Sequence, residues 1–161
     1  MKKNTGLTLI ELIIYVTILL TLLAVTTKIF SSLIDSQLET SQTSSVEQDS
    51  RYIFARLSSD ISRATSITTP SLLGQTSGTL TLVINGLNST YSLNGNNLEL
   101  SDNYGLYQLN SFGSTVSNLS FQRLGNASGK PSIKVTFTLS STAKRNSQSE
   151  VKTYSTTIGT R

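Results

Sequence analysis

The chain has 161 residues, of which 37% are hydrophobic and only 14% are charged, and its formal net charge is +4. Soluble domains usually have about a quarter of their residues charged, and here hydroxyl side chains, 27 serines and 23 threonines, make up the difference. The sequence has no histidine and no cysteine. This excludes Ser-His-Asp and Cys-His catalysis, zinc sites with imidazole or thiolate ligands, iron–sulfur clusters and disulfides. The positive charge is small and scattered, so we expect no nucleic-acid contact.

Glycine and proline divide the chain into two parts. Residues 7–69 contain neither, whereas nine of the ten glycines and both prolines follow that stretch. A run of this length without helix breakers predicts a helix, and the Asn-Gly, Gly-Asn and Ser-Gly pairs beyond it predict strands joined by turns. The predicted fold class is therefore α+β, with a long N-terminal helix followed by an antiparallel sheet.

The first part of the predicted helix is apolar on every side. Residues 7–30 contain only Glu11, Lys28 and several threonines as polar side chains, and as a helix they would extend roughly 36 Å, enough to cross a bilayer. Lys2 and Lys3 precede this segment and favour a cytoplasmic N-terminus with the remainder of the chain outside. A cleaved secretory signal fits less well, because residues 23–27 offer no Ala-x-Ala pattern.

Residues 31–68 are predicted to continue the helix as an amphipathic segment. Apolar residues recur there at spacings of three, four and seven, which marks one apolar face. This stripe is the predicted cover for the buried face of the sheet, and its main members are Val46, Ile53, Leu57 and Ile61.

Polar residues of the same segment lead to two further predictions. The pairs Glu47–Arg51 and Asp60–Arg63 have helical spacing and are interpreted as ion pairs on the surface. Residues 40–45 are rich in hydroxyl side chains that compete for backbone hydrogen bonds, so a local bend or fraying is expected there.

Residues 69–161 are predicted to form one antiparallel sheet with one solvent-exposed face. A tight turn at residues 94–97 should place Tyr91 and Leu93 opposite Leu98 and Leu100. A short strand is expected at residues 119–121 and a weaker one near residues 151–158. The clearest strand alternates polar residues with four inward apolar ones, Ile133, Val135, Phe137 and Leu139.

Residues 2–13, KKNTGLTLIELI, resemble the processing and methylation signature of type IV prepilins and type II secretion pseudopilins. In that family a basic leader ends in glycine, and a bulky apolar residue and Thr-Leu-Ile-Glu-Leu follow. The resemblance implies that a membrane prepilin peptidase cleaves between Gly6 and Leu7 and that the new amino group of Leu7 is N-methylated. The chain departs from the family at Leu7, where phenylalanine is more common, but the position needs only a bulky apolar side chain.

The resemblance implies a division of the chain and a function. Residues 1–6 would be a leader peptide, 7–30 the transmembrane and assembly helix, 31–68 its amphipathic continuation, and 69–161 the globular part of a pilin-like fold. The implied function is a structural subunit of a type IV pilus or a type II secretion-like pseudopilus. Residues 119–137 are similar to the C-terminal part of J-type minor pseudopilins, but their alternation is shared by many sheets and does not separate a minor from a major pilin. The expected subunit is a minor one.

The same resemblance implies partners and a location. The partners would be the prepilin peptidase and N-methyltransferase, other pilin or pseudopilin subunits, an inner-membrane assembly platform, and membrane lipid before assembly. The chain would first cross the cytoplasmic membrane once with its C-terminal part outside. It would then join a filament in the periplasm or on the cell surface.

Glu11 is the residue on which assembly is expected to depend. A carboxylate inside an apolar membrane segment costs about 2.5–3.5 kcal/mol on insertion scales, so it calls for a partner. Cleavage would create an amine at Leu7, and helices packed in parallel with an axial offset can place the amine of one subunit against Glu11 of the next. The alternative interpretation is that Glu11 lies near the lipid headgroups and is solvated.

No enzymatic activity, cofactor or metal is expected. The competing functions are an uncleaved single-pass anchor carrying an extracytoplasmic binding module, and an extracytoplasmic hydrolase that uses a Ser/Lys dyad or paired carboxylates. Glu99 and Asp102 are close in sequence, but Glu99 falls on the exposed face of its strand and Asp102 begins a turn, so both are interpreted as solvated. The turn at Asp102 and Asn103 offers few oxygen ligands for a calcium ion.

Overall fold

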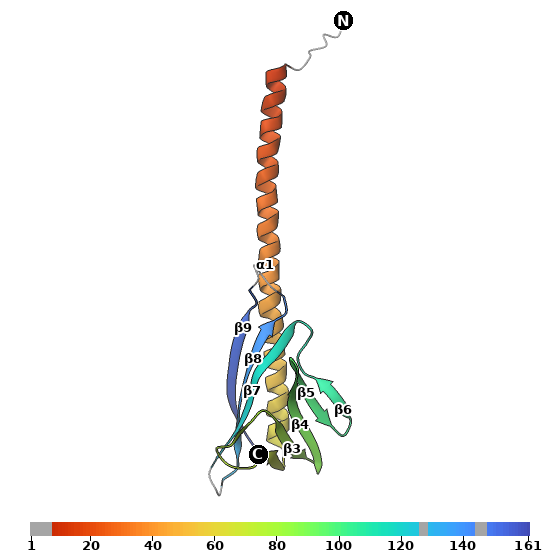
Figure 1. Ribbon diagram of the computed structural model, residues 1–161, viewed down its shortest axis with the longest axis vertical. Helices are drawn as coiled ribbons and strands as arrows, with labels where there is room; N and C mark the ends of the chain where they lie inside the picture. Colours follow the sequence, from red (N-terminus) through yellow and green to blue (C-terminus); the bar gives the residue numbers. More distant parts are fainter. Residues whose placement is uncertain (1–7, 126–128, 144–147) are drawn as a thin grey trace. The chain divides into compact units, whose positions relative to one another are not determined.

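The computed structural model describes residues 8–125, 129–143 and 148–161. These residues form one helix and nine strands (Figure 1), which confirms the predicted α+β class and gives a pilin-like arrangement. The elements are α1 (Leu9–Arg63), β1 (Ser66–Thr69), β2 (Thr76–Ser77), β3 (Leu80–Ile84), β4 (Leu87–Asn94), β5 (Asn97–Asp102), β6 (Gly105–Gln108), β7 (Ser114–Leu124), β8 (Ser132–Ser141) and β9 (Val151–Gly159).

The chain divides into two compact units at residues 39 and 40, within α1. In the first unit, residues 9–39 are helical and nearly all exposed. The threonine hydroxyls of this segment donate to backbone carbonyls one turn earlier, for example Thr17 to Ile13 and Thr21 to Thr17, both at 2.8 Å. Because these donors are satisfied within the helix, the threonines do not oppose an apolar environment.

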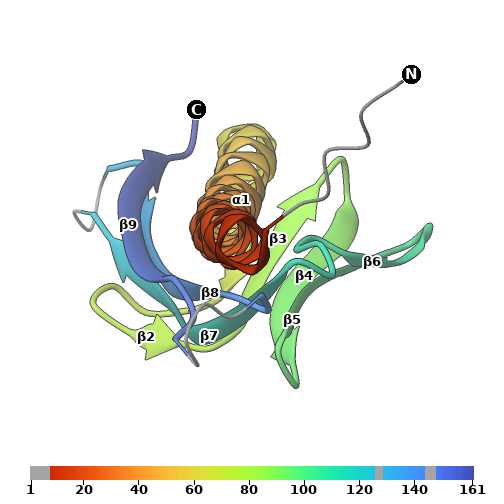
Figure 2. The ribbon, with the colours of Figure 1, turned by 90° about the horizontal axis from the view of Figure 1, so that it is seen from above.

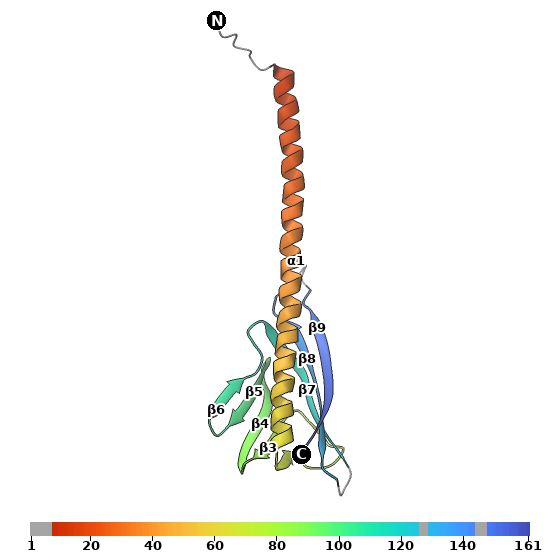
Figure 3. The same cartoon turned by 180° about the vertical axis from the view of Figure 1, so that it is seen from behind.

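The second unit contains two antiparallel sheets, where the sequence predicted one. The first has the strand order β1-β3-β4-β5-β6 and the second β2-β7-β8-β9. The prediction was wrong on this point because alternation shows which side of a strand is buried but not which strand lies beside it. Figure 2 shows the two sheets standing to either side of the last part of the helix, and in Figure 3 that helical segment lies in front of both.

The predicted strands and their turn are confirmed in register. Tyr91 pairs with Leu100 and Leu93 with Leu98, and the turn between them contains Gly95 with a φ of 59°. A positive φ is a conformation that glycine adopts without strain, which explains the tight connection. The strand expected at residues 119–121 is part of the longer β7, and the last strand is present as β9.

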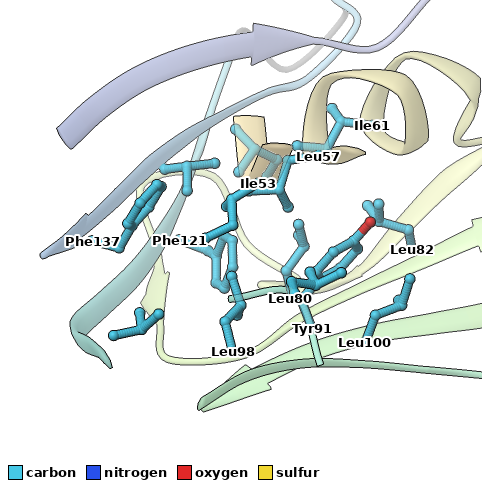
Figure 4. Packing of buried hydrophobic residues seen from close by; sticks show 14 of the residues in the cluster. Ile53, Leu57, Ile61, Leu80, Leu82, Tyr91, Leu98, Leu100, Phe121 and Phe137 are labelled. Atoms are coloured by element: carbon cyan, nitrogen blue, oxygen red, sulfur yellow. The ribbon is translucent and has the colours of Figure 1, made fainter. Parts of the chain in front are cut away.

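The core of the second unit lies between the helix and both sheets. All four members of the predicted helical stripe are fully buried, and so are the four inward residues of β8. Figure 4 shows Ile53, Leu57 and Ile61 packed against side chains of both sheets, Leu80, Leu82, Tyr91, Leu98, Leu100, Phe121 and Phe137. Burial of each such side chain stabilises the fold by roughly 1.5–3 kcal/mol, so the stripe holds the two sheets together.

Two local predictions about the helix differ from the structure. The helix ends at Arg63 rather than continuing to residue 68, because Ser66–Thr69 form β1, where β-branched side chains favour a strand. Residues 40–45 remain helical, contrary to the expected bend. The hydroxyl of Thr43 donates to Glu150 at 2.6 Å and that of Ser45 to the carbonyl of Ser41 at 2.9 Å, so both have partners that leave the helix intact.

Candidate functional site

The predicted processing site lies at the very start of the chain. Lys2, Lys3, Gly6 and Leu7 fall outside the residues that the structure describes, so their predicted roles stay predictions. Glu11 is described and lies in the first turn of α1. Its carboxylate accepts two long hydrogen bonds from Thr8, one from the backbone N–H and one from the hydroxyl, both at 3.4 Å.

The contact between Thr8 and Glu11 is a helix cap that the sequence analysis did not anticipate. A threonine that precedes a helix and a glutamate three residues later form a capping box, in which the carboxylate accepts from the backbone N–H of the threonine. The Thr-x-x-Glu spacing was the available signal. Glu11 therefore has a local role at the helix terminus, and any role in assembly has to be separated from it.

The helical segment that contains Glu11 is apolar and is not covered by any of the described residues. Its large apolar side chains from Leu9 to Ile34 are 45–79% exposed. Within the described residues, α1 contains an 18-residue window with a mean hydropathy of 2.5 and none of its residues buried. By length and composition this segment can cross a membrane, and an apolar surface on all sides of a helix needs lipid or other helices around it.

The second unit contains a buried carboxylate that the sequence analysis placed on the surface. The predicted pair Asp60–Arg63 is present at 2.6 Å, but Asp60 is only 1% exposed. The same carboxylate accepts from Arg56 at 3.0 Å and from the hydroxyl of Tyr91 at 2.5 Å. Three donors thus compensate one buried charge and link the end of α1 to β4. The other predicted pair, Glu47–Arg51, is confirmed as a surface pair at 3.4 Å.

The electrostatic effects of this cluster are strongest at Tyr91. Burial and the hydrogen bond to Asp60 both raise the pKa of the Tyr91 phenol far above its ordinary range. Burial lowers the pKa of Arg56, but the attraction of Asp60 and the contact with Tyr91 outweigh it, so the pKa of Arg56 is raised. These two shifts keep the Tyr91 phenol protonated and the Arg56 guanidinium charged at neutral pH, which suits a structural role.

A second buried carboxylate fixes the connection between the two sheets. Asp49 is 6% exposed and accepts from the backbone N–H and hydroxyl of Ser111 at 2.9 and 2.8 Å and from the hydroxyl of Ser114. The chain approaches the helix closely here, because a Cβ on Gly113 would lie 2.9 Å from the Ser45 hydroxyl. Sequence reasoning missed this cluster, since Asp49 lies more than 60 residues before Ser111 and Ser114.

The two carboxylates considered for catalysis have local structural partners. Glu99 accepts from the side-chain amide of Asn94 at 3.1 and 3.2 Å. Asp102 accepts from the backbone N–H groups of Tyr104 and Gly105 at 2.8 and 3.1 Å, which holds the turn before β6. Neither carboxylate is fully buried.

Comparison with known proteins identifies the N-terminal segment. Residues 1–27 match the family model of the prokaryotic N-terminal methylation motif. No curated protein and no solved structure matches the chain. The motif is the signal of type IV pilin-like prepilins, a structural rather than enzymatic class, and it implies processing by a prepilin peptidase and assembly with other pilin subunits in general.

The motif and the apolar helix together suggest membrane anchoring with a C-terminal domain. Residues 1–27 therefore carry a prepilin signal on a chain of pilin-like architecture, which supports a processed subunit of the pilin or pseudopilin type.

Proposed function

We propose that the chain is a minor structural subunit of a type IV pilus or a type II secretion-like pseudopilus. The observation that carries this proposal is the methylation motif at residues 1–27, which coincides with an apolar, uncovered helical segment. The subunit first crosses the cytoplasmic membrane with its C-terminal part outside. It then exchanges lipid for neighbouring helices as the assembly platform adds it to a filament.

Processing is proposed to cut the chain after Gly6 and to methylate the amino group of Leu7. Lys2 and Lys3 orient the precursor and are then removed. The mature chain keeps 11 basic and 9 acidic side chains, a formal net charge of +2. A nearly neutral subunit packs beside copies of similar charge without strong repulsion.

Mass spectrometry of the intact protein tests the processing step. In cells with an active prepilin peptidase, the purified chain should lack residues 1–6 and carry one additional methyl group. Gly6→Val places a β-branched side chain at the bond to be cut and should block cleavage, whereas Asn4→Val, two residues earlier, should not. A chain that keeps Met1 beside the active peptidase would instead support the uncleaved membrane-anchored binding module.

Glu11 is proposed to set the axial register between subunits. In a parallel bundle of helices, its carboxylate would accept hydrogen bonds from the Leu7 amine of the neighbouring subunit, while leucine and isoleucine side chains supply the bulk of the contact. In this chain, its described partner is Thr8, at the long distance of 3.4 Å. A carboxylate with such a weak local partner has capacity for a stronger one outside the chain.

The variant Glu11→Gln separates register from helix capping. Glutamine retains the capping box with Thr8 but removes the negative charge, and Glu11→Ala removes both. Both variants should insert into the membrane, and both should be depleted at least about tenfold from sheared filaments relative to membranes. Asp35→Asn, which removes one charge from the same unit outside the apolar run, should assemble normally. Normal assembly of Glu11→Gln would show that the charge is not needed.

A further inference from the structure

The inner face of the first sheet extends beyond the part that the helix covers. Tyr107 of β6 pairs with Leu100 of β5, and directly paired residues of antiparallel strands lie on the same face. Leu100 is 1% exposed beneath the helix, whereas Tyr107, one strand further out, is 46% exposed. An aromatic side chain thus continues the core face of the sheet into solvent.

Two adjoining hollows lie along this open face within the second unit. One has a volume of about 280 Å³, with Tyr52 of α1, Tyr104 and Tyr107 as walls and Leu100 in its lining. The other has a volume of about 180 Å³ and is lined mainly by polar groups, among them Asn85, Ser89, Asn103 and Arg63. Arg56, Asp102 and Tyr104 line both, so the hollows form one cleft with an aromatic and a polar end.

The walls of this cleft are held in place without a ligand. Asp102 accepts from the backbone N–H groups of Tyr104 and Gly105, which fixes the turn that carries the first tyrosine. Arg56 is held by its ion pair with buried Asp60 at 3.0 Å. The Tyr107 ring lies against Gly105, 3.9 Å from where a Cβ would be. A binding surface ordered in advance loses less conformational entropy when a ligand arrives.

The charges around the cleft select against ionic ligands. Arg56 and Arg63 are balanced by Asp60 and Asp102, so the lining has no formal net charge. The amide and hydroxyl groups at the polar end offer both donors and acceptors. A proline-rich peptide would use the aromatic end but has few donors for the acceptor oxygens at the polar end, and a polyanion would meet the carboxylate of Asp102.

We infer that this cleft binds a neutral oligosaccharide. The C–H face of one sugar ring stacks on the exposed tyrosines Tyr104 and Tyr107, and the hydroxyls of the next ring exchange hydrogen bonds with Asn85 and Asn103. A chain of linked sugars has both an apolar ring face and many hydroxyls, which are the two chemistries that the ends of the cleft provide. The inference is independent of whether the chain joins a filament.

Saturation-transfer NMR on the full chain tests this inference. The protein is studied in a phosphocholine detergent, because alkyl glycoside detergents would themselves present sugars to the cleft. The probes are cellotetraose, maltotetraose, mannotetraose and tetra-N-acetylchitotetraose, and the comparison ligands are tetragalacturonate and a decaproline peptide. At least one neutral tetrasaccharide should bind with a dissociation constant on the order of 1 mM.

Variants of the exposed aromatic residues locate the binding site. Tyr104→Ala and Tyr107→Ala should each weaken binding about tenfold, whereas Tyr107→Phe, which keeps the ring, should change it less than about twofold. Phe112→Ala is the matched control, because Phe112 is 95% exposed and does not line either hollow.

Three results would overturn the inference. The first is that none of the four neutral tetrasaccharides binds. The second is binding that persists in both tyrosine-to-alanine variants or is weakened as much by Phe112→Ala. The third is that tetragalacturonate or decaproline binds more tightly than every neutral sugar, which would assign the cleft to another class of ligand.

Discussion

The two parts of α1 use apolar side chains in opposite ways. In residues 9–39 these side chains point in every direction and are exposed, whereas in residues 40–63 most of them gather in one stripe, whose members Val46, Ile53, Leu57 and Ile61 are fully buried. Since both parts are helical, the difference arises from how many apolar residues each part contains and from how these residues are distributed around the axis. The striped part is folded onto the sheets of its own chain, and the other part requires surroundings that the described residues do not supply.

The carboxylates of the two parts of α1 also differ in whether their own chain provides partners for them. Asp60 lies in the striped part and has three donors from its own unit, two of them cationic. Glu11 lies in the apolar part, and its described partner is the neighbouring Thr8. Buried or membrane-embedded charges need compensation, and Glu11 has no cationic partner among the described residues, which is the basis of the proposal that its partner lies in another subunit.

Substitution of one leucine in each part of the helix should give the largest difference. Leu57→Ala removes a fully buried side chain and should lower the free energy of unfolding of the second unit by about 3 kcal/mol through lost burial and a cavity. Leu19→Ala, at a residue that is 63% exposed, should leave that free energy within about 0.5 kcal/mol of wild type. Urea unfolding of the full chain in micelles, followed by near-ultraviolet circular dichroism, measures both. An equal loss in the two variants would contradict the division into two units.

The stripe that includes Leu57 was predictable because its signal is local. Helical spacing, the missing helix breakers and the turn at residues 94–97 each depend on residues within a few positions of one another. The division into two sheets was not predictable, because β2 has only two residues and pairs with β7 across a long stretch of sequence. The burial of Asp60 depends on Tyr91, 31 residues away, and a spacing of three from Arg63 fits a surface pair equally well.

For the candidate sites, too, the features with a local signal in the sequence were the predictable ones. The prepilin signal is a short contiguous motif, so the sequence contained all of it. The tyrosine-lined cleft combines one turn of α1 with the turn before β6, and only folding brings Tyr52 near Tyr104 and Tyr107. The spacing of these tyrosines in the sequence does not indicate that they lie close together.

Removal of the Asp60 carboxylate tests whether the second unit depends on internal charge compensation. Asp60→Ala should lower the free energy of unfolding by about 2 kcal/mol, because Tyr91 and the two arginines lose their common acceptor. The effect stays below that of a completely buried ion pair, since Arg56 and Arg63 are 40% and 61% exposed and water can solvate them. Asp35→Ala is the control in the first unit and should change this free energy little. A loss below about 0.5 kcal/mol for Asp60→Ala would show that the cluster contributes little to folding.

Removal of the Tyr91 hydroxyl should have the smallest effect on the free energy of unfolding, and this effect should depend on pH. Tyr91→Phe removes one hydrogen bond to Asp60 and should cost about 1 kcal/mol at pH 8. The raised pKa of Tyr91 means that the folded protein keeps the phenol protonated when the unfolded chain begins to ionise it near pH 10. Wild type therefore loses stability above that pH, by about 1 kcal/mol at pH 11, and the phenylalanine variant lacks this loss. The difference between the two proteins in urea unfolding should fall to about zero at pH 11. A difference that stays constant between pH 8 and pH 11 would show that Tyr91 ionises as readily in the folded protein as in the unfolded chain.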